Sequence, residues 1–290
     1  MSTETEAQPV PATGSAPGPV AASLTVYRWE LEKLTAQFRV RAAAGAAILA
    51  PWLFVLALRA QDTVPADTLF GRWVHLTGFA TPLVILVFTT QWALPLLISL
   101  VAGDIFAAED RYGTWKTLLT RGAGRGAIFA GKALAAATYT VVIVLLLALS
   151  SVAAGVVVLG HDPLVGLSGT LIPAGTAVGL VLASWATVLP AALGFAAVGM
   201  LFSVLTRNGP AGILAPTVVG LLMQLYAFVD GPAVVRHAML TSGFDGWHGL
   251  LTARPFYGPL VTGIFVSLGY VVVCLAAAYL LLRRRDITEG

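Results

Sequence analysis

The chain has 290 residues, of which 58% are hydrophobic and 11% are charged, and its mean hydropathy is +0.86. Soluble proteins carry about a quarter of charged residues, because water-facing surfaces need them. This composition therefore excludes a soluble domain and predicts an integral membrane protein. The net charge of +3 fits contact with anionic lipid headgroups, so we expect membrane lipids and no nucleic acid as partners.

Residues 1–22 are rich in Pro, Ala and Gly and show no periodicity. They lack the basic start and apolar centre of a signal peptide, so we expect a disordered tail. From 23 to 41, apolar residues recur at spacings of three and four, at Leu24, Tyr27, Leu31, Leu34 and Phe38. This stripe predicts an amphipathic helix that either lies in the membrane interface or packs against the ends of neighbouring spans.

Six apolar runs follow in the segment 42–290, and a bilayer-spanning helix needs about 20 such residues. They are Ala42–Leu58, Phe79–Ala102, Ala133–Leu159, Leu171–Leu205, Ala211–Val229 and Pro259–Leu282. The fourth run contains Pro173 and Pro190, so it is either one kinked helix or a broken pair. A single kinked helix leaves both termini on one side of the membrane. On that side lie all of the 17 basic residues except Arg59, Arg72, Arg236 and Arg254. This positive-inside distribution favours the single helix and predicts cytoplasmic termini.

Polar groups inside the runs are few. Asp104, at the end of the second run, is interpreted as a solvated helix end. Gln91 and Gln224 lie within the second and fifth runs, where they either line a pathway or bridge two helices. Gly175 and Gly179 form a small-xxx-small pair, which predicts the close approach of another helix.

Between the second and third runs lies a charged segment, AEDRYGTWKTLLTRGAGRGAIFAGK, at 108–132. Tyr112, Trp115 and Leu119 recur at helical spacing, which predicts an amphipathic helix. Such a helix has no core of its own to join. It lies on the membrane surface or docks onto a separate soluble protein, and we expect Trp115 to make that contact.

The string GAIFAGKA at 126–133 imitates a phosphate-binding P-loop. The P-loop needs a Ser or Thr after its lysine to bind magnesium, and a strand before its glycines. Here Ala133 follows Lys132 and a membrane run begins at once. We therefore expect no ATP site in this chain.

The string GLSG at 166–169 is similar to the serine motif of intramembrane proteases. A serine nucleophile needs a histidine within hydrogen-bond reach, yet all four histidines fall in loops predicted to be external: His75, His161, His237 and His248. We interpret Ser168 as a turn or cap residue. The same scatter of histidines predicts no metal site.

The segment 230–258 is long and aromatic, with Phe244, Trp247, Phe256 and Tyr257. Trp and Tyr prefer the membrane interface, so we expect short helices that re-enter the outer leaflet here. They form either a structural plug or a substrate gate.

The stretch Ile105 to Arg125, IFAAEDRYGTWKTLLTRGAGR, contains an acidic pair, then Arg, a Gly-Thr, apolar residues and a closing Thr-Arg. Together with six spans and an amphipathic first helix, this pattern resembles the permease subunits of the type-2 ABC exporter family. In that family the segment is a coupling helix, received by a groove on a separate ATP-binding subunit. The resemblance places the coupling helix at about 108–120 and implies contacts with the ATP-binding subunit by Glu109, Arg111, Gly113, Thr114, Leu118, Leu119, Thr120 and Arg121. Three further contact residues differ in type from the family's commoner ones, namely Tyr112, Trp115 and Lys116.

The resemblance implies an all-α permease that exports an amphipathic drug, peptide or lipid across the cytoplasmic membrane. Two copies, or this chain and a related permease, would pair, and two ATP-binding subunits would hold the ATP and Mg. The chain itself would be no enzyme and would hold no cofactor or metal. Two alternatives are a membrane-embedded serine enzyme built on GLSG and an assembly subunit without a transport path. Copurification with an ATPase would separate the exporter from both.

Overall fold

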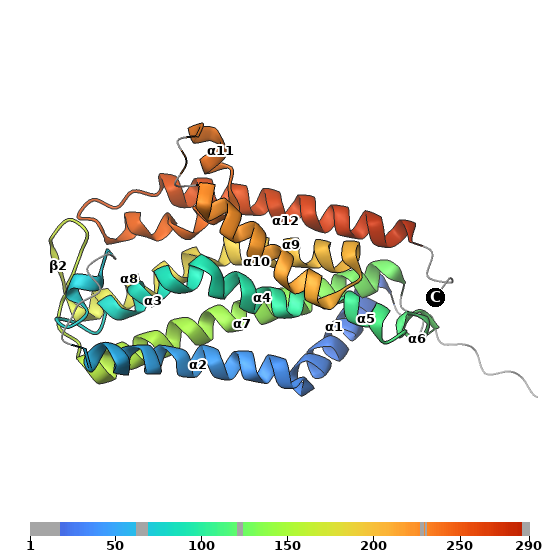
Figure 1. Ribbon diagram of the computed structural model, residues 1–290, viewed down its shortest axis with the longest axis horizontal. Coiled ribbons are helices and arrows are strands. Elements are labelled where there is room, and N and C mark those ends of the chain that lie inside the picture. The colour runs from blue at the N-terminus through green and yellow to red at the C-terminus, as the bar shows by residue number, and fades with distance from the viewer. Residues whose placement is uncertain (1–17, 62–68, 121–123, 227–228, 230, 286–290) are drawn as a thin grey trace, which may run out of the picture.

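The computed structural model describes residues 18–61, 69–120, 124–226, 229 and 231–285, so most of the expected tail lies outside the described part. Long helices run side by side along the length of the molecule (Figure 1). Six are long and apolar enough to cross a membrane: Phe38–Arg59, Ala80–Ala102, Arg125–Leu159, Ala174–Thr206, Gly209–Tyr226 and Gly258–Arg284. The chain is therefore an all-α multi-pass membrane protein, as its composition predicts.

The first helix, α1 (Pro19–Ala36), is separated from α2 (Phe38–Arg59) by Gln37, whose backbone is extended. The buried face of α1 differs from the expected stripe. Val26, Glu30 and Leu34 are buried, whereas Phe38 is exposed. This face packs on α7, where a side chain in place of Gly131 would collide with Val26. A helix pressed against a neighbouring span explains why an acidic residue occupies an inward position.

The second span is interrupted by a π-helical turn. It consists of α3 (Ala80–Phe88), η2 (Thr89–Ala93) and α4 (Leu94–Ala102). The hydroxyls of Thr89 and Thr90 donate to backbone carbonyls one turn earlier, and Pro95 begins the next segment without an amide hydrogen. The threonine hydroxyls compete with backbone amides for these carbonyls, and Pro95 supplies no amide hydrogen. Both effects favour a wider, π-helical turn.

The third span is longer than its apolar run predicts. Helix α7 (Arg125–Leu159) has 35 residues and continues eight residues before Ala133. Lys132, expected in a loop, therefore lies on a helix among other helices. The fourth span is kinked, since α8 (Ala174–Thr187) and α9 (Leu189–Thr206) meet at Val188, beside Pro190.

A short hairpin caps one end of the bundle. Strands β1 (Leu164–Val165) and β2 (Leu171–Ile172) pair antiparallel around the GLSG string. Gly169 has a φ of 77°, which a turn requires and which glycine adopts without strain. We call this the hairpin end. The opposite end, which holds α1, α5 (Ala107–Arg111), α6 (Trp115–Thr120) and the end of α12, is the charged end (Figure 1).

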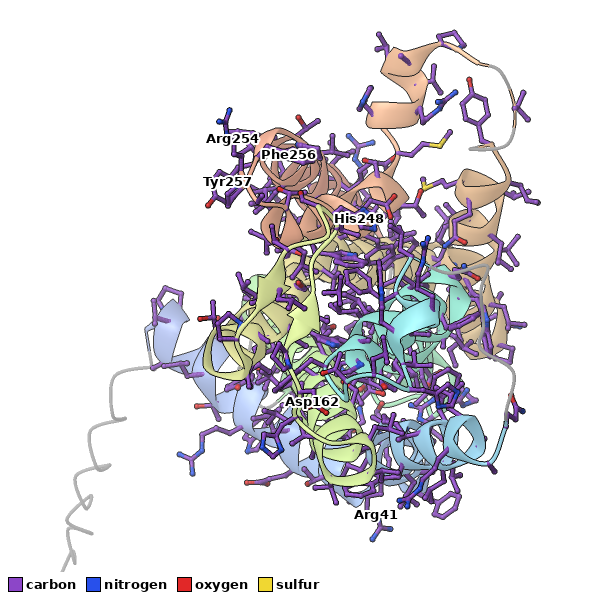
Figure 2. The ribbon with its side chains drawn as sticks, turned by 90° about the vertical axis from the view of Figure 1, so that its left-hand side faces the viewer. Arg41, Asp162, His248, Arg254, Phe256 and Tyr257 are labelled. Atoms are coloured by element: carbon purple, nitrogen blue, oxygen red, sulfur yellow. The ribbon has the colours of Figure 1, made fainter. Side chains whose placement is uncertain are left out.

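The fifth span, α10 (Gly209–Tyr226), is followed by short helices and then by the sixth span, α12 (Gly258–Arg284). These short helices are α11 (Ala233–His237), η3 (Leu240–Phe244) and η4 (Gly246–Leu251). Another short helix, η1 (Gly71–Trp73), lies earlier in the chain, before α3. Helix α11 stands away from the bundle (Figure 1). The aromatic residues divide, because Phe244 and Trp247 are buried in the core while Phe256 and Tyr257 are exposed. Figure 2 shows the exposed pair with Arg254 at one edge of the hairpin end.

Glycines bring two pairs of helices into backbone contact. Gly103, after α4, lies against Gly212 of α10, and a Cβ on either would collide with the other's carbonyl. Gly78 and Gly155 meet in the same way nearer the hairpin end. The predicted pair Gly175 and Gly179 has open space instead, because both are exposed on the outer side of α8 and no described atom lies within 4 Å of their Cβ positions.

Candidate functional site

The segment expected to be one coupling helix is two short helices. Helix α5 ends at Arg111 and α6 begins at Trp115. Gly113 has a φ of 62°, in the left-handed region, and the Thr114 amide donates to the carbonyl of Glu109 at 3.0 Å. A left-handed residue ends a right-handed helix, so the helical spacing of Tyr112, Trp115 and Leu119 does not place them on one face.

A buried ion-pair cluster lies behind this segment. Lys132 is fully buried, and its ammonium group donates to Glu30 at 2.7 Å, to Glu109 at 2.8 Å and to the carbonyl of Ile105 at 3.0 Å. Lys33 donates to the same oxygen of Glu109 at 2.5 Å. A buried charge is tolerated only when it is paired and hydrogen-bonded, and here two cations meet two anions. The cluster joins α1, α5 and α7.

The electrostatics favour the charged forms of Glu109 and Lys33. Burial by itself would raise the pKa of the Glu109 carboxyl, but the Lys132 and Lys33 ammonium groups outweigh it and lower this pKa to about 2. Burial would likewise lower the pKa of Lys33, whereas Glu30 and Glu109 raise it above its ordinary value. Both shifts favour the ion pair between Lys33 and Glu109, so these two groups stay ionised at neutral pH.

Asp104 is not a solvated helix end. It is fully buried, with Arg39 of α2 at 2.5 Å and Arg111 of α5 at 3.2 Å from one carboxylate oxygen. The other oxygen lies where a Cβ on Gly209 would be. The end of the second span is covered by α2, α5 and the start of α10, which the sequence pattern alone does not reveal.

Trp115 lies inside this chain. Its side chain is 4% exposed, its ring stacks on Phe106 with centroids 6.3 Å apart, and its Nε1 donates to Asp110 at 3.0 Å. Asp110 also forms an ion pair with Arg285 at the end of α12, and the Arg285 guanidinium lies 5.9 Å from the Trp115 ring centroid. The adjacent acids therefore have different partners, since Glu109 binds α1 and α7 while Asp110 binds α12.

The outer surface of the segment is made by other residues. Tyr112 is 70% exposed, and the side chains of Arg111, Lys116 and Thr120 are exposed beside it. Leu118 and Leu119 are half-buried against the core, the Thr114 hydroxyl binds Glu109, and Arg121 lies outside the described residues. We call the exposed set Arg111, Tyr112, Gly113, Lys116, Thr117 and Thr120 the outer face. It is the part of the segment that a second protein can reach.

The structure brings Gln91 and Gln224 together. The Gln224 amide donates to the carbonyl of Gln91 at 2.6 Å and to that of Thr90 at 3.3 Å. These carbonyls belong to the π-helical turn, where the ordinary helical bonds are displaced. Both glutamines line a cavity of about 440 Å³ beside α11 and η3. They bridge two helices, as one of the two sequence interpretations has it, and that they line a pathway stays a prediction.

The two motif lookalikes have structural roles. All three ammonium donors of Lys132 are used within the chain, which leaves none for a phosphate. Ser168 accepts a hydrogen bond from the backbone amide of Ala253 at 3.0 Å, which ties the hairpin to the end of η4. Within the described ranges no histidine bonds to this hydroxyl, and no three His, Cys, Asp or Glu residues could hold a metal ion.

Glu30, Arg39 and Arg285 take part in the ion pairs at the charged end, and the sequence pattern did not single them out. Glu30 had a usable signal, because it stands midway between Val26 and Leu34 on the apolar face of α1. An acid at that spacing indicates a buried partner. Arg285 offered no such signal, since its partner Asp110 lies 175 residues earlier in the chain.

One comparison with known proteins identifies a family for this chain. A family model described as an ABC-2 family transporter protein matches residues 27–207 of the chain. The search of curated proteins found no match. The matched range begins in α1 and ends just after α9, so it contains the outer face and the whole ion-pair cluster, but not Arg285.

Proposed function

We propose that this chain, which belongs to the ABC-2 transporter family, is the permease of an ATP-driven exporter whose energy comes from a separate ATP-binding subunit. Two permease copies, or this chain with a related one, form the pathway, and two ATP-binding subunits hold ATP and Mg beneath them. The cargo is amphipathic, such as a drug, a peptide or a lipid. The chain lies in the plasma membrane, with its charged end on the cytoplasmic side.

The carrying observation is the set of ion pairs that fastens α5 to the rest of the bundle. Through Glu109 the segment is bonded to α1 and α7, and through Asp110 it is bonded to α12. A force on the outer face is thereby passed to several helices at once. Packed helices move as rigid bodies between two arrangements, which is how such a push opens a pathway.

The orientation rests on charge. The cations of the cluster and the arginines that end α12 gather at the charged end, while the hairpin end carries few basic groups. Membrane proteins keep excess Lys and Arg on the cytoplasmic side. Both termini then lie in the cytoplasm, where the ATP-binding subunit is found.

The test uses two exposed tyrosines at opposite ends. Tyr112 is on the outer face, and Tyr257, which is 54% exposed, is near the hairpin end. The tagged chain is purified gently from its own cells, and the ATP hydrolysis that copurifies is measured. Tyr112→Ala should lower it about tenfold or more, because a large interface aromatic contributes about 2 kcal/mol. Tyr257→Ala should leave it unchanged.

Two results would reject the proposal. One is the absence of copurifying hydrolysis from the unaltered chain under conditions that keep it folded. The other is hydrolysis by the chain alone that disappears on Lys132→Met, since this would place the ATP site in the chain itself. Equal hydrolysis with Tyr112→Ala and Tyr257→Ala would move the contact away from the outer face.

A further inference from the structure

The cavity of about 440 Å³ lies between the π-helical turn η2, the end of α10, and α11 with η3 and η4. This volume is in the range that binds a drug-sized molecule. Its wall is largely apolar, with Val87, Met223, Phe244 and Trp247 among the lining residues. It therefore suits a ligand with a substantial hydrocarbon part.

The cavity has a fixed floor. The bonds from Gln224 to the carbonyls of Thr90 and Gln91 join α10 to the π-helical turn. They use backbone acceptors that the wide turn leaves without their ordinary partners. The Gln224 amide and these two carbonyls are thus bonded to each other, and none of them carries a net charge that would select the charge of a ligand.

Charge is supplied by three lining residues: Arg236, His237 and Asp245. Arg236 is exposed and forms no ion pair with any residue in the described part of the chain. His237 bonds through Nδ1 to the carbonyl of Ala233 at 2.7 Å, which leaves its Nε2 to face outward from that bond. Two potential cations thus stand beside one carboxylate.

Within the described part of the chain, Asp245 forms no ion pair with Arg236 or His237. Although its side chain is exposed at the cavity, the protein packed around it raises its pKa, and the nearby His248 only partly opposes that shift. The charged group that interacts with the Asp245 carboxyl is His248, which Figure 2 labels. Arg236 thus lines a largely apolar cavity as an exposed cation that has no ion pair among the described residues.

We propose that this cavity binds the transported substrate and that the substrate is an amphiphile with an anionic head group, held by Arg236 with help from His237. The apolar wall takes the hydrocarbon part. A guanidinium group recognises carboxylate and phosphate oxygens through paired hydrogen bonds, so either head group fits. The inference rests on the proposed function only where it says that the bound molecule is transported.

The test compares three probes that share one tail. Dansylaminoundecanoic acid is anionic, its methyl ester is neutral, and the matching alkylammonium is cationic. The purified chain is placed in nanodiscs of phosphatidylcholine, and binding is followed by dansyl fluorescence. The acid should bind about tenfold more tightly than the ester, which corresponds to about 1.4 kcal/mol. The cation should bind most weakly.

Matched variants locate the effect. Arg236→Gln should abolish the preference for the acid, and His237→Gln should reduce it. Arg254→Gln removes another exposed arginine, one that does not line the cavity, and should leave the preference intact. Equal affinity for all three probes would overturn the inference, and so would an acid preference that survives Arg236→Gln.

A second arm identifies the source of the anion. Adding phosphatidylglycerol to the nanodiscs should displace the acid if a bilayer lipid occupies the site, and should not if the ligand is a free single-chain amphiphile. None of these measurements uses ATP, so failed anion binding leaves the exporter proposal standing, and absent copurifying hydrolysis leaves the anion site standing.

Discussion

The charged end and the cavity differ in how their cationic side chains are buried and paired. At the charged end, Lys132 has two carboxylates and a carbonyl around it and is closed to solvent. At the cavity, Arg236 is open and has no ion pair among the described residues. A buried charge whose partners belong to the same chain fixes the helices that supply them. An open, unpaired charge instead remains free for a ligand, so the first region is built as a joint and the second as a site.

The largest expected difference between the two regions is the loss of stability on substitution of Lys132. Lys132→Met leaves Glu30 and Glu109 sharing only Lys33, and removal of one partner from a buried ion pair costs about 3–5 kcal/mol. Thermal unfolding in detergent should show a large loss of stability. Arg236→Met should change the melting temperature little, because surface substitutions are mostly within about 0.5 kcal/mol.

A double variant sharpens this prediction. Lys132→Met combined with Glu109→Gln should recover part of the lost stability, since Glu30 then keeps Lys33 as its partner. If Lys132→Met and Arg236→Met unfold at the same temperature, the cluster is not the joint described here.

The glycine contact provides the next largest expected effect. Gly212→Ala puts a Cβ into the carbonyl of Gly103, and overpacking of this kind costs about 1–3 kcal/mol. Gly179→Ala adds the same atom where there is open space, and alanine favours a helix by up to about 1 kcal/mol over glycine. The two variants should therefore shift the melting temperature in opposite directions. A shift of the same sign would show that α10 does not rest on Gly103.

Arg285→Gln tests the bond to α12. It removes the ion pair with Asp110, in which both side chains are 12% exposed, and a hydrogen bond to a charged group contributes about 1.5–3 kcal/mol. Some of that is retained, because the Trp115 indole still binds Asp110. Arg284→Gln, at an exposed neighbouring position, is the control. Unfolding monitored by tryptophan fluorescence should separate them.

The last effect appears only in acid. Because the pKa of Glu109 is lowered to about 2 from 4.5, its contribution to stability is complete above pH 4.5 and is lost as the pH falls from there toward 2. The unaltered chain should lose stability more steeply than Glu109→Gln across this window. Parallel curves for the two proteins would show that the Glu109 carboxylate does not stabilise the fold.

The spans could be predicted because each is a local apolar run of sufficient length. Ala80–Ala102 was placed to within a residue, and the kink at Pro190 follows from a missing amide hydrogen. The segment 108–120 is set apart by its own charged residues, but its internal geometry could not be predicted from them. The residue spacing predicts one helix that continues through Gly113, whereas the left-handed backbone of Gly113 divides it in two.

The inside of the charged end could not be predicted, because its contacts join distant parts of the chain. Lys132 and Glu30 are 102 residues apart, and nothing near either residue specifies the other. Trp115 illustrates the same limit. An aromatic residue in a polar segment fits a docking contact or an internal one equally well, and only the positions of Phe106 and Asp110 decide that it is internal.

The backbone contact of Gly103 with Gly212 also sets a lever length for α10. At about 1.5 Å per residue, Gln224 lies roughly 18 Å beyond this contact along the helix axis. If the contact serves as the fulcrum, a tilt of about 10° moves Gln224 by roughly 3 Å, which is enough to break its bonds to the π-helical turn. A rotation too small to disturb the packing near Gly212 would thus change the dimensions of the cavity at the far end of the same helix.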